Sequence, residues 1–197
     1  MSKLLNVSSS PHVRCGVSTK NLMYDVAIAM LPATIWGVMQ FGIYSLIVVV
    51  ATVLSCVLSE YLFETLMHKP VTISDGSALV TGMILGLNMP PAIPLWMPIL
   101  GGVFAIIVVK QLYGGLGQNW MNPALAARCF MLISFAQAMT KFTDPVTDAV
   151  ASATPLAAIK AGDTYDLAAM FIGKIPGTIG EVSVIALLIG AIYMVVR

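Results

Sequence analysis

A few charged side chains lie within the long apolar runs of this sequence, and they are the first candidates for a functional site. Glu60 and Glu64 lie four positions apart in one such run, so a helix would place both carboxylates on one face. Carboxylates inside a membrane helix are costly and often mark an ion pathway, so the pair could line a path for a cation. Alternatively, both side chains lie near the end of the helix and reach the membrane interface.

Arg128 is the second candidate, six positions after Asn122 in an apolar run. An arginine is costly in hydrocarbon and rarely faces lipid. We therefore expect its guanidinium to contact a carboxylate, a carbonyl or the phosphate of a ligand. A purely structural ion pair is the alternative.

Two apolar segments begin with a polar residue and resemble interrupted membrane helices. One begins at Asp75 and stops before Pro90 and Pro91, and the other follows Asn122, an N-cap residue before a proline. In many transporters, such helix N-termini point at an anionic ligand near the middle of the membrane. Asp75 could instead be a simple helix cap. Candidate contacts for a flavin or another anion are Arg128, Asn119, Asn122 and Asp75.

Gly82 and Gly86 in the first of these segments leave room for a flat cofactor or for another helix backbone. Other motifs are absent. His12 and His68 are isolated and lack metal-ligand spacing. The glycine-rich run 114–117 follows an apolar segment rather than a βαβ unit, so it is not a nucleotide fingerprint. We expect no metal site and no catalytic residue in the usual sense.

The composition defines the class of protein to which these residues belong. Of 197 residues, 58% are hydrophobic and 10% are charged, whereas a soluble domain averages about 25% charged residues. The net charge of +1 argues against a nucleic-acid partner, which requires a concentrated basic surface. The expected fold is an all-α integral membrane protein, a polytopic helical bundle with short or broken membrane helices that forms part of a larger bundle.

The apolar runs predict the helices and loops that carry the candidate residues. We expect a polar tail over 1–21, a membrane bundle over 22–139, a polar loop over 140–181 and a further membrane helix over 182–197. The predicted membrane elements of the bundle are spans at about 22–40, 43–67, 94–113 and 122–139 and a short helix over 75–89.

Orientation follows from the distribution of lysine and arginine. With a cytoplasmic N-terminus, six positive residues face the cytoplasm: Lys3, Arg14, Lys20, Lys69, Lys110 and Arg197. The 140–181 loop then carries three lysines among five acids and faces away from the cytoplasm. This count assumes that the short third element carries the chain across the membrane.

Several stretches together resemble the RnfD family of membrane subunits and, more distantly, NqrB. They are 10–14 (SPHVR), 75–82 (DGSALVTG), 110–119 (KQLYGGLGQN), 122–124 (NPA), 152–156 (SATPL) and 175–181 (IPGTIGE). The match extends from near residue 10 to the end of the chain. It is expected to cover only the first part of a typical member, as if the sequence were truncated after Arg197.

The resemblance implies a membrane subunit of a ferredoxin:NAD⁺ oxidoreductase, the Rnf complex of the bacterial cytoplasmic (inner) membrane, which couples electron flow to Na⁺ or H⁺ translocation. The subunit is part of a translocase and not an independent enzyme. Its implied partners are the other membrane, flavin and iron–sulfur subunits of that complex, the lipid bilayer and a flavin transferase.

The resemblance also implies an FMN joined through its phosphate to Thr154. In the family's attachment motif, Asp148, Ala153 and Thr154 match, whereas Ala151 and Ser152 stand where a hydroxyl residue and a glycine are expected. A second, non-covalent flavin, such as riboflavin, is implied within the bundle. From the residues alone, a non-redox transporter or channel and a scaffold subunit stay open as alternative functions.

Overall fold

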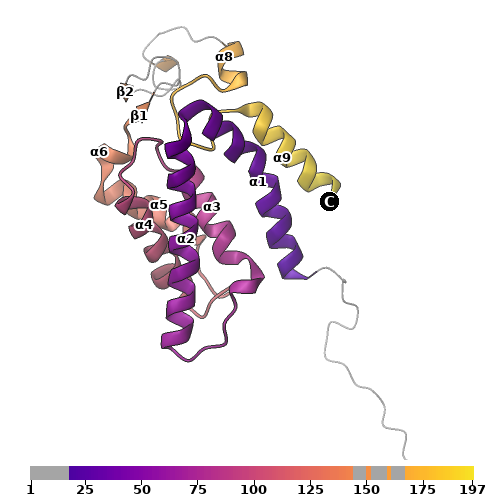
Figure 1. Cartoon of the computed structure of the whole chain (residues 1–197), viewed down its shortest axis with the longest axis vertical. Coiled ribbons are helices and arrows are strands. Elements are labelled where there is room, and N and C mark those ends of the chain that lie inside the picture. Colours follow the sequence, from indigo (N-terminus) through magenta and orange to yellow (C-terminus); the bar gives the residue numbers. More distant parts are fainter. Residues whose placement is uncertain (1–17, 144–149, 152–158, 161–166) are drawn as a thin grey trace, which may run out of the picture.

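A computed structural model describes residues 18–143, 150–151, 159–160 and 167–197. These residues form a bundle of helices, with a pair of short strands and one short helix at one end (Figure 1). The predicted helical membrane-protein class is confirmed, with the addition of one pair of two-residue strands, β1 (Phe142–Thr143) and β2 (Val150–Ala151), which are antiparallel.

Helices α1 (Thr19–Phe41) and α2 (Ile43–Leu66) are each long and apolar enough to cross a membrane. The hydroxyl of Ser18 caps α1 by accepting a hydrogen bond from the Asn21 amide. Gly42 separates the two helices with a φ of +82°, a backbone conformation that glycine adopts without steric cost. The turn there reverses the chain, so α2 runs back toward the end at which α1 begins (Figure 1).

A short 3₁₀ turn, η1 (Ile73–Asp75), leads into the short helix α3 (Ser77–Leu87). Gly82 and Gly86 lie on the face of α3 that packs against α2. A Cβ atom at Gly82 would lie 2.6 Å from the Cα of Val53, and one at Gly86 would lie 3.0 Å from the Cα of Val49. The α2 backbone therefore fills the space beside these glycines, and they serve helix packing rather than contact with a flat cofactor.

The segment from η1 to Ile93 carries the chain along nearly the full length of α2. At its start, the backbone amide of Thr72 donates to Glu64 in the last turns of α2, at 2.9 Å. At its end, the hydroxyl of Tyr44 in the first turn of α2 donates to the carbonyl of Ile93, also at 2.9 Å. The short helix and the residues after it thus cross the bundle, as the predicted orientation requires.

The next predicted span is not one regular helix. Helix α4 (Trp96–Val103) continues into a π-helix, η2 (Phe104–Gln111). The predicted helix over 122–139 is likewise divided, into α5 (Pro123–Ser134) and α6 (Ala136–Met139). A π-helix has a wider turn than an α-helix and often lies at a functional site, and here it determines which side chains face the interior.

After α8 (Leu167–Ile172), the chain returns into the bundle before the last helix, α9 (Val184–Val196). The amides of Ile179 and Gly180 donate to the carbonyls of Met89 and Leu87 at 3.1 and 2.8 Å, which satisfies carbonyls that the end of α3 would otherwise leave free. Ile179 is fully buried. The end of the predicted polar loop is therefore part of the core.

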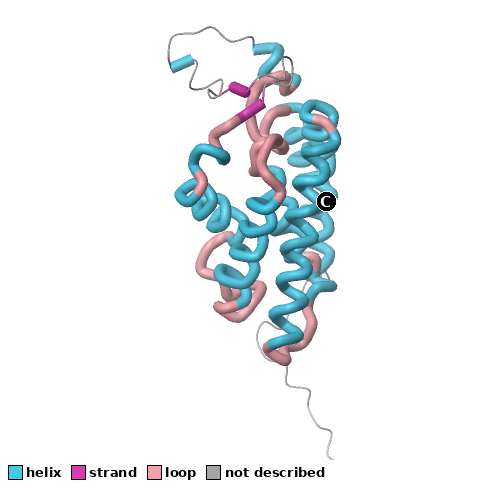
Figure 2. The backbone as a smooth tube through the Cα atoms, turned by 60° about the vertical axis from the view of Figure 1, so that its left-hand side comes forward, coloured by secondary structure: helices cyan, strands magenta, loops and turns pink. Residues whose placement is uncertain are grey.

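The bundle has two distinct ends. The strand pair and α8 lie at one end, which we call the loop end, and α1 begins at the other, the N-terminal end (Figures 1 and 2). The C-terminus of α2 and the residues that follow it lie at the N-terminal end. Arg197, at the end of α9, contacts Asp25 in the second turn of α1 at 3.3 Å.

Candidate functional site

A buried ion pair lies between α2 and η2. The Nζ atom of Lys110 donates to Oε1 of Glu60 at 2.6 Å, and the exposed fractions of the two residues are 2% and 0%. Glu64, one turn further along α2, is 2% exposed. The interpretation that Glu60 and Glu64 reach out to the membrane interface is therefore wrong, because both carboxylates point into the bundle.

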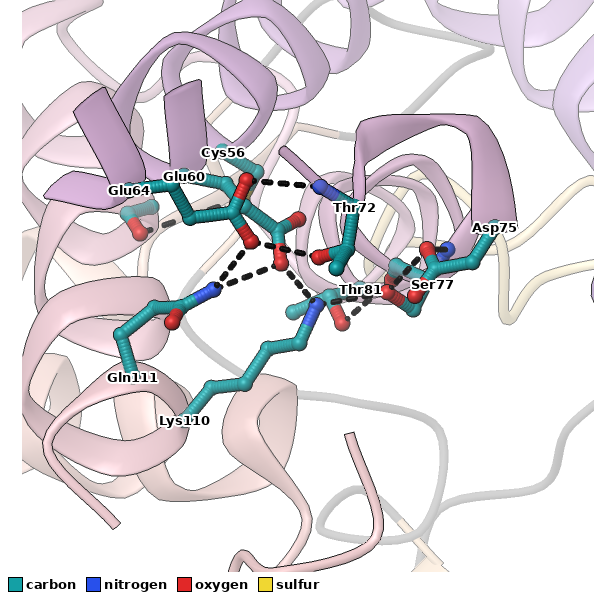
Figure 3. Close-up of polar contacts among 10 residues, drawn as sticks. Cys56, Glu60, Glu64, Thr72, Asp75, Ser77, Thr81, Lys110 and Gln111 are labelled. Carbon is teal, nitrogen blue, oxygen red and sulfur yellow. Dashed lines mark hydrogen bonds and ion pairs between the residues drawn. The ribbon is translucent and has the colours of Figure 1, made fainter. Parts of the chain in front are cut away.

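Lys110 also contacts the beginning of the short helix α3. Its Nζ donates to the hydroxyl oxygen of Ser77 at 2.6 Å. The Ser77 hydroxyl in turn donates to Asp75 at 2.6 Å, and the Ser77 amide donates to the same carboxylate oxygen at 2.8 Å. Figure 3 shows these groups converging from α2, α3 and η2. The turn from η1 into α3 therefore places a hydroxyl against the buried ammonium and holds that hydroxyl with the capping carboxylate.

Glu64 is held by neutral donors rather than by a cation. Thr72 donates to it through both its amide and its hydroxyl. The side-chain amide of Gln111 bridges the two glutamates, at 2.8 Å from Glu60 and 3.3 Å from Glu64. Since Thr72 is exposed, a continuous run of hydrogen-bonding groups leads from the N-terminal end of the bundle to the fully buried Glu60 (Figure 3).

Glu60 retains an open acceptor. Its Oε2 atom is buried and has no hydrogen-bond partner among the residues that the structure describes. Leaving such an atom unpaired is costly. Glu60 contacts the ammonium of Lys110 directly, while Glu64 is connected to Glu60 through Gln111 and Asp75 to Lys110 through Ser77. Three carboxylates thus share one ammonium, so the cluster can accept a further monovalent positive charge, either a proton or a small cation. Within the described ranges, no group of three His, Cys, Asp or Glu side chains has the arrangement of a metal site.

Lys110 was predicted to face the cytoplasm, and this prediction is wrong because its side chain is buried. The sequence carried only a weak signal, a lysine at the end of an apolar run before the glycine-rich loop. Its partner Glu60 lies 50 positions earlier, and no local pattern connects the two. Lys20, Lys69 and Arg197 remain at the N-terminal end and are exposed.

Arg128 contacts an amide carbonyl, one of the three kinds of partner that were expected. Its Nη1 donates to Oδ1 of Asn88 at 2.6 Å. Asn88 is the residue at the C-terminal end of α3, so the guanidinium lies near the negative end of that helix dipole. Arg128 and Asn88 also line a cavity of about 380 Å³ between α1, α3 and α9, together with Glu181.

The N-termini of the two short helices are occupied by the chain's own side chains. Oδ1 of Asn122 accepts hydrogen bonds from the amides of Ala124 and Leu125 at 3.0 and 3.3 Å, and Asp75 accepts from the amide of Ser77. Both residues act as caps, and both helices begin at the N-terminal end rather than meeting at the middle of the bundle. Contact of either residue with a flavin stays a prediction.

Asn122 also borders a second, mainly apolar cavity of about 470 Å³ between η2 and α5. The aromatic side chains around it are those of Phe104, Tyr113 and Trp120. Asn119 does not line this cavity, and its side-chain amide donates to the carbonyl of Met121 at 2.9 Å. Thr154 and the other attachment-motif residues, Asp148, Ser152 and Ala153, lie outside the described residues.

Long apolar helices, a broken third helix and a buried ion pair between them define a polytopic membrane protein with an ionisable interior. The chain belongs to the NQR2, RnfD, RnfE family, whose sequence profile matches residues 6–197.

Curated relatives carry names that agree with this family. The chain is 46% identical, over 98% of its length, to the D subunit of the Na⁺-translocating ferredoxin:NAD⁺ oxidoreductase complex of Acetobacterium woodii. It is 39% identical, over 98% of its length, to the D subunit of the proton-translocating ferredoxin:NAD⁺ oxidoreductase complex of Clostridium ljungdahlii. It is 30% identical, over 95% of its length, to the D subunit of the ion-translocating oxidoreductase complex of Rhodobacter capsulatus. The chain spans 63%, 63% and 62% of these relatives, respectively.

Proposed function

We propose that this chain is the flavin-carrying part of the D subunit, a membrane subunit, of a Rnf-type ferredoxin:NAD⁺ oxidoreductase, which couples electron transfer to Na⁺ or H⁺ translocation. Two relatives that match 98% of the chain are named for such complexes, one translocating Na⁺ and the other protons. The subunit acts with the other subunits of the complex in the bacterial cytoplasmic membrane.

The observation that carries the ion-coupling part is the buried pair of Glu60 and Lys110. Ionisable groups inside a membrane protein are expensive and usually serve a pathway or a proton relay. The open Oε2 atom of Glu60 and the hydrogen-bonded run through Glu64 to the exposed Thr72 are what such a pathway needs. In our proposal, a cation enters from the N-terminal end, passes Glu64 and reaches Glu60.

The redox part of the proposal is an FMN joined by a phosphoester to Thr154, with Asp148, Ser152 and Ala153 as the surrounding motif. A covalent tether holds a cofactor at high local concentration, while the protein contributes its position and the flavin carries the electrons. The attachment loop is proposed to face away from the cytoplasm, with the N-terminus on the cytoplasmic side. Without Lys110, five of the six positive residues counted on the N-terminal side remain, against three lysines in the 140–181 loop, so the bias still favours this orientation.

A second, non-covalent flavin such as riboflavin is proposed for the cavity between η2 and α5. Its volume of about 470 Å³ falls within the usual range of ligand cavities. Phe104, Tyr113 and Trp120 offer aromatic faces on which a flat ring can stack. The side-chain amide nitrogen of Asn122, whose oxygen caps α5, is one polar group on this wall that could orient the ring.

The test of the redox proposal is in-gel fluorescence of the denatured subunit from natively expressed complex. Wild-type protein and a Ser152→Gly variant should show a flavin band under ultraviolet light, and Thr154→Val, which lacks the hydroxyl, should not. A non-fluorescent wild-type band would favour a plain transporter or a scaffold subunit. If Thr154→Val keeps the band and Ser152→Ala loses it, Ser152 carries the flavin.

A further inference from the structure

The ammonium of Lys110 occupies one of the two carboxylate oxygens at which a cation could bind Glu60. Its ammonium is 2.6 Å from a carboxylate oxygen of Glu60 and 2.6 Å from the hydroxyl oxygen of Ser77. Carboxylate and hydroxyl oxygens are the kind of ligand that hard cations take. The lysine ammonium is itself a compact positive charge on a flexible stem. The chain therefore supplies its own cation to the fully buried carboxylate of Glu60.

The carboxylate is not saturated by this lysine. Oε1 of Glu60 accepts hydrogen bonds from Lys110 and Gln111, whereas Oε2 is buried with no partner in the described part of the chain. The nearby carboxylates accept hydrogen bonds from neutral groups. Thr72 and Gln111 donate to Glu64. Ser77 donates to Asp75. An incoming cation thus meets an available oxygen on Glu60, but also the positive charge of Lys110 beside it.

We propose that Lys110 is a tethered competitor, which weakens the binding of a monovalent cation at Glu60 and keeps the carboxylate neutralised when no cation is bound. This inference rests on the proposed function, in which Glu60 and Glu64 line a cation path. A cation that reaches Glu60 must share the carboxylate with the ammonium or displace it. The ammonium then favours release of the cation, which a translocating site requires as much as binding.

The size of the effect follows from simple electrostatics. Two unit positive charges about 4 Å apart, at the effective dielectric constant of a protein, repel by an amount equivalent to roughly a thousandfold in affinity. Relaxation of the lysine side chain reduces this penalty. We expect removal of the charge to strengthen cation binding by at least about tenfold.

The experiment uses the purified complex with the full-length subunit. Its thermal unfolding midpoint is measured against NaCl concentration at fixed pH, with choline chloride holding the ionic strength constant. A bound cation at concentration c stabilises the folded protein by RT ln(1 + c/Kd), so fitting this relation to the titration yields Kd, the half-saturating concentration. A second titration varies pH without Na⁺, so that Na⁺ and protons are distinguished.

Lys110→Met is the central variant, because methionine keeps the length of the side chain and removes its charge. Its half-saturating Na⁺ concentration should fall at least about tenfold below that of the wild type. If the site takes a proton, its pH midpoint should instead rise by at least about one unit, which is the same factor of ten. Lys110→Arg retains the charge and should resemble the wild type. Lys69→Met removes an exposed lysine near Gln111 and should resemble it too.

The proposal is overturned if Lys110→Met binds cations no more tightly than the wild type in both titrations. If Lys110→Met can be purified only in the presence of Na⁺ or at low pH, the cation replaces the lysine and the proposal stands. If it fails under all conditions while the double variant Glu60→Gln/Lys110→Met folds, no cation can take the place of Lys110, and the proposal fails.

The underlying cation path has a separate test. A Glu60→Gln complex that still couples electron transfer to ion transport would refute the path itself. A wild-type cation response that Glu60→Gln abolishes and Lys110→Met leaves unchanged would refute only the role of Lys110.

Discussion

Replacing Glu60 with glutamine tests whether the buried ion pair is as isolated as the structure indicates. The substitution keeps the shape of the side chain and an acceptor oxygen for Lys110, but it removes the negative charge. Lys110 is 2% exposed, and its two hydrogen-bond partners would then be a neutral side-chain amide and the hydroxyl of Ser77. The ammonium would be left in the interior without a bonded counter-charge.

The expected cost is substantial. Breaking a buried pair by removing one partner typically costs about 3–5 kcal/mol, because the remaining charge is uncompensated. For a chain of this size, 1 kcal/mol corresponds to about 2–4 °C in unfolding midpoint, so Glu60→Gln should lower the midpoint by about 6–20 °C. Glu64→Gln is the matched control. Its carboxylate is held by neutral donors, so we expect a loss of only about 1–2 kcal/mol.

Thermal unfolding of the purified complex, followed through the aggregation of this subunit, provides the measurement. The double variant Glu60→Gln/Lys110→Met should recover much of the lost stability, because it removes both charges and leaves neither ion unpaired. Equal midpoints for Glu60→Gln and Glu64→Gln, or a double variant less stable than Glu60→Gln, would refute the reasoning that an unpaired ammonium causes the loss.

Three further predictions concern packing, the end of α3 and orientation. Gly82→Ala places a Cβ atom 2.6 Å from the Cα of Val53, whereas the nearest atom at Gly101 is 3.5 Å away. Overpacking should therefore cost Gly82→Ala about 1–3 kcal/mol more than Gly101→Ala, and equal unfolding midpoints would contradict this. Arg128→Leu and Asn88→Ala should each destabilise the complex. Because both substitutions break the same hydrogen bond, their effects should be less than additive in the double variant. Full additivity would show that the bond contributes nothing to stability. A cysteine at the exposed Lys160 should react with a membrane-impermeant thiol reagent in intact cells lacking Cys15 and Cys129, and labelling only after lysis would reverse the proposed orientation.

Hydropathy and the polar residues that cap helices predicted much of the architecture. The apolar runs located α1 and α2, and the polar residues at Asp75 and Asn122 marked the starts of α3 and α5. Capping chemistry is local, since each cap bonds amides within three positions. Patterns of this kind can be read from sequence because the interacting groups are neighbours in the chain.

The buried charges could not be paired from sequence, because their partners are distant in it. Glu60 and Lys110 are 50 positions apart, and Asn88 and Arg128 are 40 apart. The direction in which Lys110 points depends on η2, where the wider π-helical turn replaces the regular spacing from which a helix face would be predicted. The return of Ile179 and Gly180 to the end of α3 is likewise a long-range contact.

A helix that ends inside a membrane bundle leaves backbone groups that no lipid can satisfy, and this requirement links the separate parts of the site. At the start of α3, Asp75 accepts from the first amide, and its negative charge suits the positive end of the helix dipole. At the other end, Gly180 donates to the carbonyl of Leu87, and Arg128 bonds the terminal Asn88. The same carboxylate that caps α3 orients the Ser77 hydroxyl toward Lys110, and Lys110 neutralises Glu60. The turn at the start of α3 therefore contributes to the buried charged cluster, because its cap connects Asp75 through the Ser77 hydroxyl to Lys110.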